Sequence, residues 1–169
     1  MTTILQMSFV KDLANKKIIV HRSFNAPLDL VWKAWTDSEV RDKWWMPKPW
    51  LAKTKTHRFE VGGKWHYAAI GPDGTTMWSI EEYTAIDNLH SYESICTFCD
   101  EEENKNPNFA SNTWKVVFIA IGETTRVEVE LNYPTEAAMK KMIEMGFEGG
   151  FKMALGNLDE LLASGISVY

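Results

Sequence analysis

Cysteine and long apolar runs are scarce in this sequence, and each shortage excludes a class of protein. The chain of 169 residues contains two cysteines, so it has no disulfide framework. No apolar run approaches the ~20 residues that a membrane-spanning helix needs. Residues 1–16 lack a basic start followed by an apolar core and make a poor secretory signal. We therefore expect a cytoplasmic protein without a membrane span.

Positive charge and histidine are also in short supply. Lysine and arginine number 18 against 23 aspartates and glutamates, which gives a net charge of −5. Nucleic-acid binding needs clustered lysine and arginine, so we expect no nucleic-acid partner. The four histidines are scattered and form no metal-binding motif: His21, His57, His66 and His90. The sequence therefore predicts neither a metal site nor a bound cofactor.

Recognisable catalytic motifs are missing as well. The sequence has no Gly-x-Ser-x-Gly elbow, no Walker loop and no Gly-x-Gly-x-x-Gly after a strand, so we predict no catalytic residues. Cys96 and Cys99 match Cys-x-x-Cys, but they lie in a predicted strand, where residues three apart point to opposite faces. We expect two reduced thiols without metal.

The clearest positive signal is the C-terminal stretch 135–164, which predicts one long helix. Thr135 is suited to cap its first turn, and Gly165 to end it. Its apolar residues recur at steps of four and three: Ile143, Phe147, Phe151, Leu155, Leu158 and Leu162. At ~1.5 Å per residue the helix would be about 45 Å long, so it needs a large apolar partner surface.

The preceding sequence predicts a sheet as that partner. A β-branched strand at 17–24 is followed by two short helices, one beginning at Pro27 and one over 38–45, with Thr36 and Glu39 in capping-box spacing. Further strands are predicted at 53–60, 64–70, 75–86, 90–99, 114–121 and 125–132, with a surface loop at 100–112. Residues 1–15 fit a strand, a helix or a loose arm. Consecutive hairpins indicate an α+β protein with a curved antiparallel sheet of about six or seven strands around the final helix.

Three glycines interrupt the predicted long helix, at positions 146, 149 and 150. A glycine in a helix interior costs about 1 kcal/mol relative to alanine, so each needs a compensating reason. A local kink is one such reason. We favour the other, close approach of the helix to the sheet at these positions.

Several short motifs, together covering roughly 17–163, carry a resemblance to a known family. They are 24–27 with 31–36, Trp44-Trp45, 59–65, 71–74, 124–127, 146–151, Leu155 and 158–162. On these motifs the chain resembles the family of the activator of the ninety-kilodalton heat-shock protein ATPase. That family belongs to the START-like (SRPBCC) superfamily, so the resemblance implies a helix-grip fold over 17–169, preceded by an arm or extra strand at 1–16.

The sequence departs from the family pattern in three places. Glu81 stands near a position where the family often has glycine, and the loop at 100–112 is longer than a minimal version. The eukaryotic co-chaperone also carries a separate N-terminal domain that residues 1–15 are too short to form. This last departure weakens the expectation of a co-chaperone role.

Three functions remain open at this stage. The first is binding of a small, largely apolar, lipid- or polyketide-like molecule in a cavity between sheet and helix. The second, which the family implies, is a co-chaperone-like interaction with a role in the stress response. The third is a cyclase or hydrolase of the same superfamily. A homodimer is compatible with all three functions. An enclosed cavity favours the first, copurification with a chaperone the second, and a cavity carboxylate with a strongly shifted pKa the third.

For the first hypothesis, the cavity is predicted to combine polar-tipped aromatic residues with flexible apolar ones. Aromatic residues with polar tips orient a ligand, and methionines give an adaptable wall. The candidate lining residues are Trp65, Tyr67, Trp78, Glu81, Tyr83, Met142, Met145, Phe151 and Met153.

Overall fold

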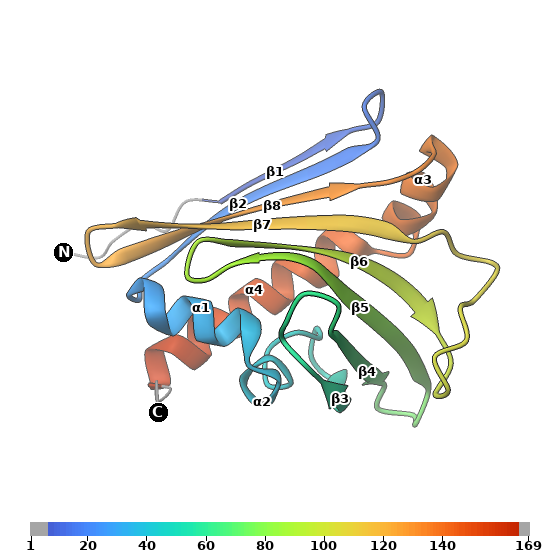
Figure 1. The fold of residues 1–169 in the computed structure, drawn as a ribbon, viewed down its shortest axis with the longest axis horizontal. Coiled ribbons are helices and arrows are strands. Elements are labelled where there is room, and N and C mark those ends of the chain that lie inside the picture. The colour runs from blue at the N-terminus through green and yellow to red at the C-terminus, as the bar shows by residue number, and fades with distance from the viewer. Residues whose placement is uncertain (1–6, 166–169) are drawn as a thin grey trace.

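A curved antiparallel sheet with helices against its concave face forms the part of the protein described by the computed structural model, residues 7–165 (Figure 1). Within these residues the sheet has 8 strands in the order β1-β2-β8-β7-β6-β5-β4-β3. The strands are β1 Met7–Asp12, β2 Lys17–Phe24, β3 Leu51–His57, β4 Lys64–Ile70, β5 Thr76–Asp87, β6 Ser91–Cys99, β7 Asn112–Ile121 and β8 Thr124–Asn132. The helices are α1 Leu28–Thr36, α2 Ser38–Arg41, α3 Glu136–Glu144 and α4 Phe147–Ser164.

The sheet topology confirms the predicted fold class and adds one strand to it. Alternation predicted β8 well, because Val127, Val129 and Leu131 are all buried on one face. The additional strand is β1, which pairs with β2 from Met7 opposite Arg22 onward. The sequence had left 1–15 open between a strand, a helix and an arm, and residues 1–6 lie outside the described part.

The second short helix is shorter than predicted and is capped differently. The carboxylate of Asp37 accepts hydrogen bonds from the backbone amides of Glu39 and Val40, so Asp37 is the N-cap of α2. The hydroxyl of Thr36 donates instead to the carbonyl of Trp32 in α1. The predicted capping box is therefore wrong. After Arg41 the chain continues in turns rather than as a helix.

The prediction of one long C-terminal helix is also wrong, because the chain breaks between α3 and α4. Thr135 caps α3 as predicted, its hydroxyl accepting from the amide of Ala138. Gly146 then adopts φ +87°, a left-handed conformation that stops one helix and allows the next to start at a new angle. Figure 1 shows α3 at one end of the sheet and α4 running across the concave face.

The prediction that the three glycines allow close approach of the helix to the sheet is wrong. A Cβ atom added at Gly146 or Gly149 would meet no heavy atom within 4 Å, and one at Gly150 would meet only Pro47 Cγ, at 3.6 Å. Glycine is favoured at position 146 because the backbone there has a positive φ. Because apolar residues keep helical spacing on both sides of the break, the sequence pattern gave no indication of this turn.

Two glycine substitutions are expected to change stability in opposite directions. Gly146→Ala should lower the free energy of unfolding by about 1 kcal/mol, because a side chain disfavours the left-handed conformation. Gly156 lies inside α4 with open space around it, so Gly156→Ala should raise the free energy of unfolding by up to about 1 kcal/mol. Urea unfolding of both variants measures these changes, and effects of the same sign would contradict the assignment of the helix break.

The solid core occupies the end of the grip that α1 closes. Trp35 and Trp44 are fully buried there and meet edge to face, with ring centroids 4.9 Å apart. The central part of α4 contributes Leu155 and Leu158, both also buried. An ion pair between Arg22 and Asp159 joins β2 to α4. No helix in the described part is long and apolar enough to cross a membrane.

Candidate ligand-binding cavity

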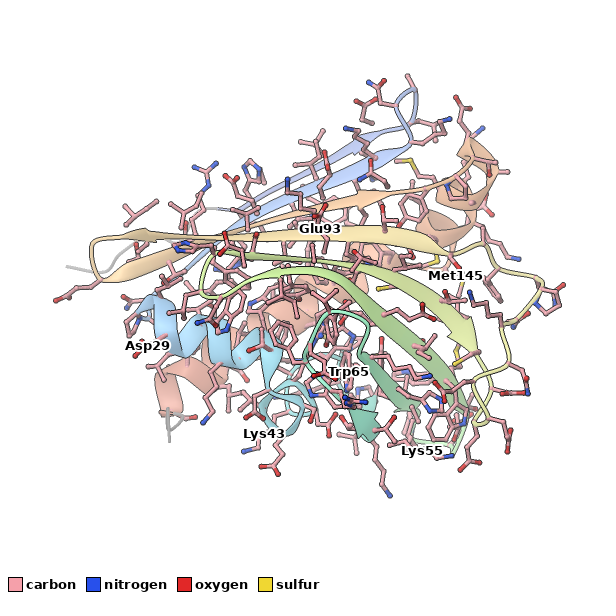
Figure 2. All side chains as sticks on the ribbon, in the orientation of Figure 1. Asp29, Lys43, Lys55, Trp65, Glu93 and Met145 are labelled. Carbon is pink, nitrogen blue, oxygen red and sulfur yellow. The ribbon has the colours of Figure 1, made fainter. Side chains whose placement is uncertain are left out.

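A cavity of about 380 Å³ lies at the other end of the grip, between the concave face of the sheet and the junction of α3 with α4. Strands β4 to β8 form its floor, and the segment 45–50 forms one wall. Figure 2 shows Met145 near α3 and Trp65 toward the middle of the molecule. Trp65 is fully buried, whereas Met145 is 47% exposed, so the cavity extends from the interior to the surface beside α3.

Strand register brings distant parts of the sequence onto the cavity floor. Trp65 in β4 is paired with Glu81 in β5, Glu81 with Cys96 in β6, and Cys96 with Asn112 in β7. Paired residues of neighbouring strands point to the same face of a sheet. All four residues therefore line the cavity as one row across the strands.

A second row lies one step nearer the open end. Tyr67 is paired with Ser79, and Ser79 with Phe98, and these three side chains also line the cavity. Neighbouring rows on one face are two residues apart along each strand, so Trp65 and Tyr67 lie side by side on β4, and Glu81 and Ser79 lie side by side on β5. The floor is therefore largely apolar with a few fixed polar groups.

An ion pair is buried at the inner end of this cavity. Arg41, from the end of α2, is 1% exposed, and Glu81 is 2% exposed. Arg41 Nη1 donates to Glu81 Oε1 at 2.7 Å, while Glu81 Oε2 accepts from Ser94 Oγ at 2.8 Å. The Cys96 thiol lies 3.6 Å from the same oxygen. The carboxylate is thus held by partners from α2 and β6.

Two tryptophans enclose the Arg41 guanidinium. Its Cζ lies 3.9 Å from the ring centroid of Trp45 and 4.1 Å from that of Trp65, and these two rings meet edge to face with centroids 5.8 Å apart, so the guanidinium sits in the corner between them. Burial is the largest single influence and opposes the charge, but the Glu81 carboxylate together with Tyr92 and Tyr83 outweighs it, and the pKa of Arg41 is raised. Arg41 is therefore positively charged at every accessible pH.

Tyr67 supplies a neutral polar group beside this pair. Its hydroxyl oxygen accepts a hydrogen bond from Trp45 Nε1 at 3.0 Å, and its ring stacks on Trp65 with centroids 3.8 Å apart. Burial raises the pKa of Tyr67 well above its usual range. The phenol therefore stays protonated and keeps a hydrogen available for donation.

Six of the nine predicted lining residues line this cavity: Trp65, Tyr67, Glu81, Met142, Met145 and Phe151. Trp78 instead points to the convex face, where its ring packs on His66 at 4.9 Å. Tyr83 is buried in the core, with its hydroxyl 3.0 Å from His57 Nε2. Met153 is 49% exposed, on the outer side of α4.

The predicted lining did not include Arg41 and Trp45, which form the polar end of the cavity together with Glu81. A charged residue in a short amphipathic segment is normally solvated, so nothing in the pattern marked Arg41 as buried. The four-residue spacing of Arg41 and Trp45 did place both on one side of the predicted second helix. The partner of Arg41 lies on β5, 40 residues away, and no local periodicity could reveal that contact.

The loop at 100–111 begins on the convex face of the sheet and ends at the cavity, where Ala110 is one of the lining residues and Phe109 packs on Phe98. His66 faces away from the cavity, because it lies between Trp65 and Tyr67 and neighbouring residues of a strand point to opposite faces. It is nevertheless only 2% exposed, because its Nε2 lies 3.1 Å from the carbonyl oxygen of Asp100 in the loop above it. The start of the predicted surface loop thus shields His66 of β4 from solvent.

The two cysteines are free thiols on opposite faces of β6. Cys96 faces the cavity, where burial and the Glu81 carboxylate raise the pKa of its thiol. Cys99 is paired with Trp78 on the convex face, and partial burial with the nearby Asp100 raises its pKa to about 11. Because the thiolate is the reactive form, both cysteines are weak nucleophiles near neutral pH.

Comparison with protein families gives one match over most of the chain. The family model described as "Activator of Hsp90 ATPase homolog 1-like protein" matches residues 25–163. No curated protein matches the chain. The family match covers α1 to α4 and therefore every element that lines the cavity.

Solved structures resemble this one over almost its whole length. A solution structure of a protein from Arthrobacter aurescens has 30% sequence identity and a TM-score of 0.88, covering 96% of this chain and 94% of that one. Protein Ms6760 from Mycobacterium smegmatis has 26% identity and a TM-score of 0.86, covering 95% and 99%. The AHSA1 protein from Silicibacter pomeroyi, with 15% identity, a TM-score of 0.69 and coverage of 87% and 97%, shares the fold.

Proposed function

We propose that this chain, which belongs to the family of activator of Hsp90 ATPase homolog 1-like proteins, binds a small, largely apolar molecule in its cavity. The observation that carries the proposal is the cavity of about 380 Å³ between the sheet and the α3–α4 junction. Small-molecule sites are typically clefts of roughly 300–1,000 Å³ with mostly apolar walls and a few polar groups that orient the ligand.

The wall formed by the helices supports this function. Met142 and Met145, in and just after α3, line the cavity together with Phe147 and Phe151 on α4. Methionine side chains are flexible and polarizable, so they adapt to ligands of different shape. The left-handed turn at Gly146 separates the two helices at this point, and the two groups of lining residues therefore belong to separate helices.

Binding can be measured with N-phenyl-1-naphthylamine, an uncharged dye whose fluorescence rises in apolar surroundings. We expect saturable binding of one dye per chain. At one hundred times its dissociation constant the dye should stabilise the folded state by roughly 2.7 kcal/mol, which a thermal-shift assay detects. Absence of a saturable fluorescence increase and of a melting-temperature shift would refute ligand binding in this cavity.

Two methionine variants locate the bound dye. Met142→Trp places a bulky ring in the cavity and should weaken dye binding at least tenfold without unfolding the protein, which circular dichroism checks. Met153→Trp is the matched control, because Met153 is 49% exposed on the outer side of α4. Equal dye affinity in the two variants would show that the dye binds elsewhere.

A further inference from the structure

Arg41 carries hydrogen-bond donors that no described residue uses. Its Nη1 donates to Glu81, but Nε and Nη2 are buried and have no partner within residues 7–165. The whole side chain is 1% exposed. Buried donors are almost always satisfied, and leaving a charged one unpartnered is especially costly. The unused donors of Arg41 therefore point to a partner that the protein chain itself does not provide.

The surroundings of Arg41 restrict where that partner can lie. Trp45 and Trp65 pack against the guanidinium, so a further acceptor must reach it on a side that these two rings leave free. Arg41 is one of the residues that line the cavity, and a molecule in the cavity is within reach. Neighbouring side chains cover Nε and Nη2, so docking requires one of them to give way slightly.

Tyr67 offers a further donor at the same end of the cavity. Its oxygen already accepts from Trp45 Nε1, and Trp45 is also one of the two rings against Arg41. The hydrogen of the Tyr67 hydroxyl has no acceptor among the described residues. Arg41 and Tyr67 therefore flank one region of the cavity with donors, and an acceptor atom placed there could use both.

The charge balance of the cavity indicates which acceptor fits. Arg41 and Glu81 are the charged residues among the described cavity lining, and they neutralise each other. A carboxylate would bring a third charge into an apolar site without a counter-ion, and burying an unpaired charge is strongly unfavourable. A carbonyl oxygen accepts the same hydrogen bonds without that penalty.

We propose that the ligand is an uncharged, largely apolar molecule whose carbonyl oxygen accepts hydrogen bonds from Arg41 and Tyr67. This assignment rests on the proposed function of the cavity and adds the chemical class of the ligand. It favours ketones, quinones and lactones over fatty-acid anions and over pure hydrocarbons.

Fluorene and 9-fluorenone are suitable probes because they have the same rigid ring system and differ by one carbonyl group. Their affinities can be measured by quenching of the cavity tryptophans. A hydrogen bond to a charged donor changes affinity by roughly tenfold or more, so fluorenone should bind about tenfold more tightly than fluorene. Fluorene-9-carboxylate, the charged relative, should bind more weakly than fluorenone.

Two variants separate the role of the donors from the role of the cavity. Arg41→Met combined with Glu81→Gln removes both charges together, so neither is left buried without its partner. Tyr67→Phe keeps the stacked ring and the Arg41–Glu81 pair but removes the hydroxyl. Each variant should retain fluorene binding within a few-fold and reduce the preference for fluorenone. The infrared carbonyl stretch of bound fluorenone should lie at a lower frequency in the unmodified protein than in the double variant.

The outcomes distinguish the two proposals. If neither fluorene nor fluorenone binds, the proposed function itself fails. If both bind with equal affinity, or if the fluorenone preference and the carbonyl frequency are unchanged in the double variant, the cavity binds ligands but Arg41 is not the donor. If fluorene-9-carboxylate binds most tightly, the ligand class is anionic and the charge argument is wrong.

Discussion

Replacing Arg41 alone by methionine is expected to lower the free energy of unfolding by about 3–5 kcal/mol. The loss of attraction between the two charges accounts for only part of this effect. The variant leaves the Glu81 carboxylate 2% exposed and without its 2.7 Å ion-pair partner, and an uncompensated buried charge is strongly destabilising. Ser94 still donates to the carboxylate, which limits the loss without cancelling it.

The double replacement Arg41→Met with Glu81→Gln is the control. It removes both charges, and glutamine keeps the carbonyl oxygen that accepts from Ser94, so most of the lost stability should return. Urea unfolding of the two single variants and the double variant gives the coupling energy of the pair. If the double variant loses as much as the sum of the singles, the ion pair is energetically uncoupled and this account of the site is wrong.

Much of the sheet could be predicted because its signals are local. The bounds of β2 and β4 were predicted as observed, and β8 was recognised from the alternation of Val127, Val129 and Leu131. The helix break at Gly146 was not, since apolar spacing continues on both sides of it. Periodicity records which residues face inward and is insensitive to one residue that changes the direction of the axis.

The candidate site was predicted in part for a related reason. Trp65 and Tyr67 were candidates because they lie on strands expected to curve around the helix, and Glu81 because it departs from the family pattern, and all three line the cavity. Arg41 could not be found in this way, because its burial depends on a partner 40 residues away and on aromatic rings from two further segments. A buried charge is determined by tertiary contacts, and the local sequence of a charged residue is the same in either environment.

Replacing Trp44 by alanine is expected to destabilise the protein by about 3–5 kcal/mol, the range for removing a buried aromatic side chain. The Trp44 side chain is fully buried, with an exposed fraction of 0%. It is not among the described residues that line the cavity. Its ring packs against Trp35 and Trp45, with centroids 4.9 Å and 5.3 Å away. Its Nε1 also donates to the carbonyl of Ala34 at 2.8 Å, which ties the turn after α2 to α1.

A graded pair of variants separates the packing of Trp44 from its hydrogen bond. Trp44→Phe keeps an aromatic ring but leaves the Ala34 carbonyl without its donor, so it should cost less than Trp44→Ala. Trp50→Ala is the control at the cavity wall, where Trp50 is only partly buried, and it should cost clearly less than Trp44→Ala. Urea midpoints and fluorescence spectra measure all three. If Trp50→Ala is the most destabilising of them, the core does not lie at the α1 end and the division into a packed end and a cavity end fails.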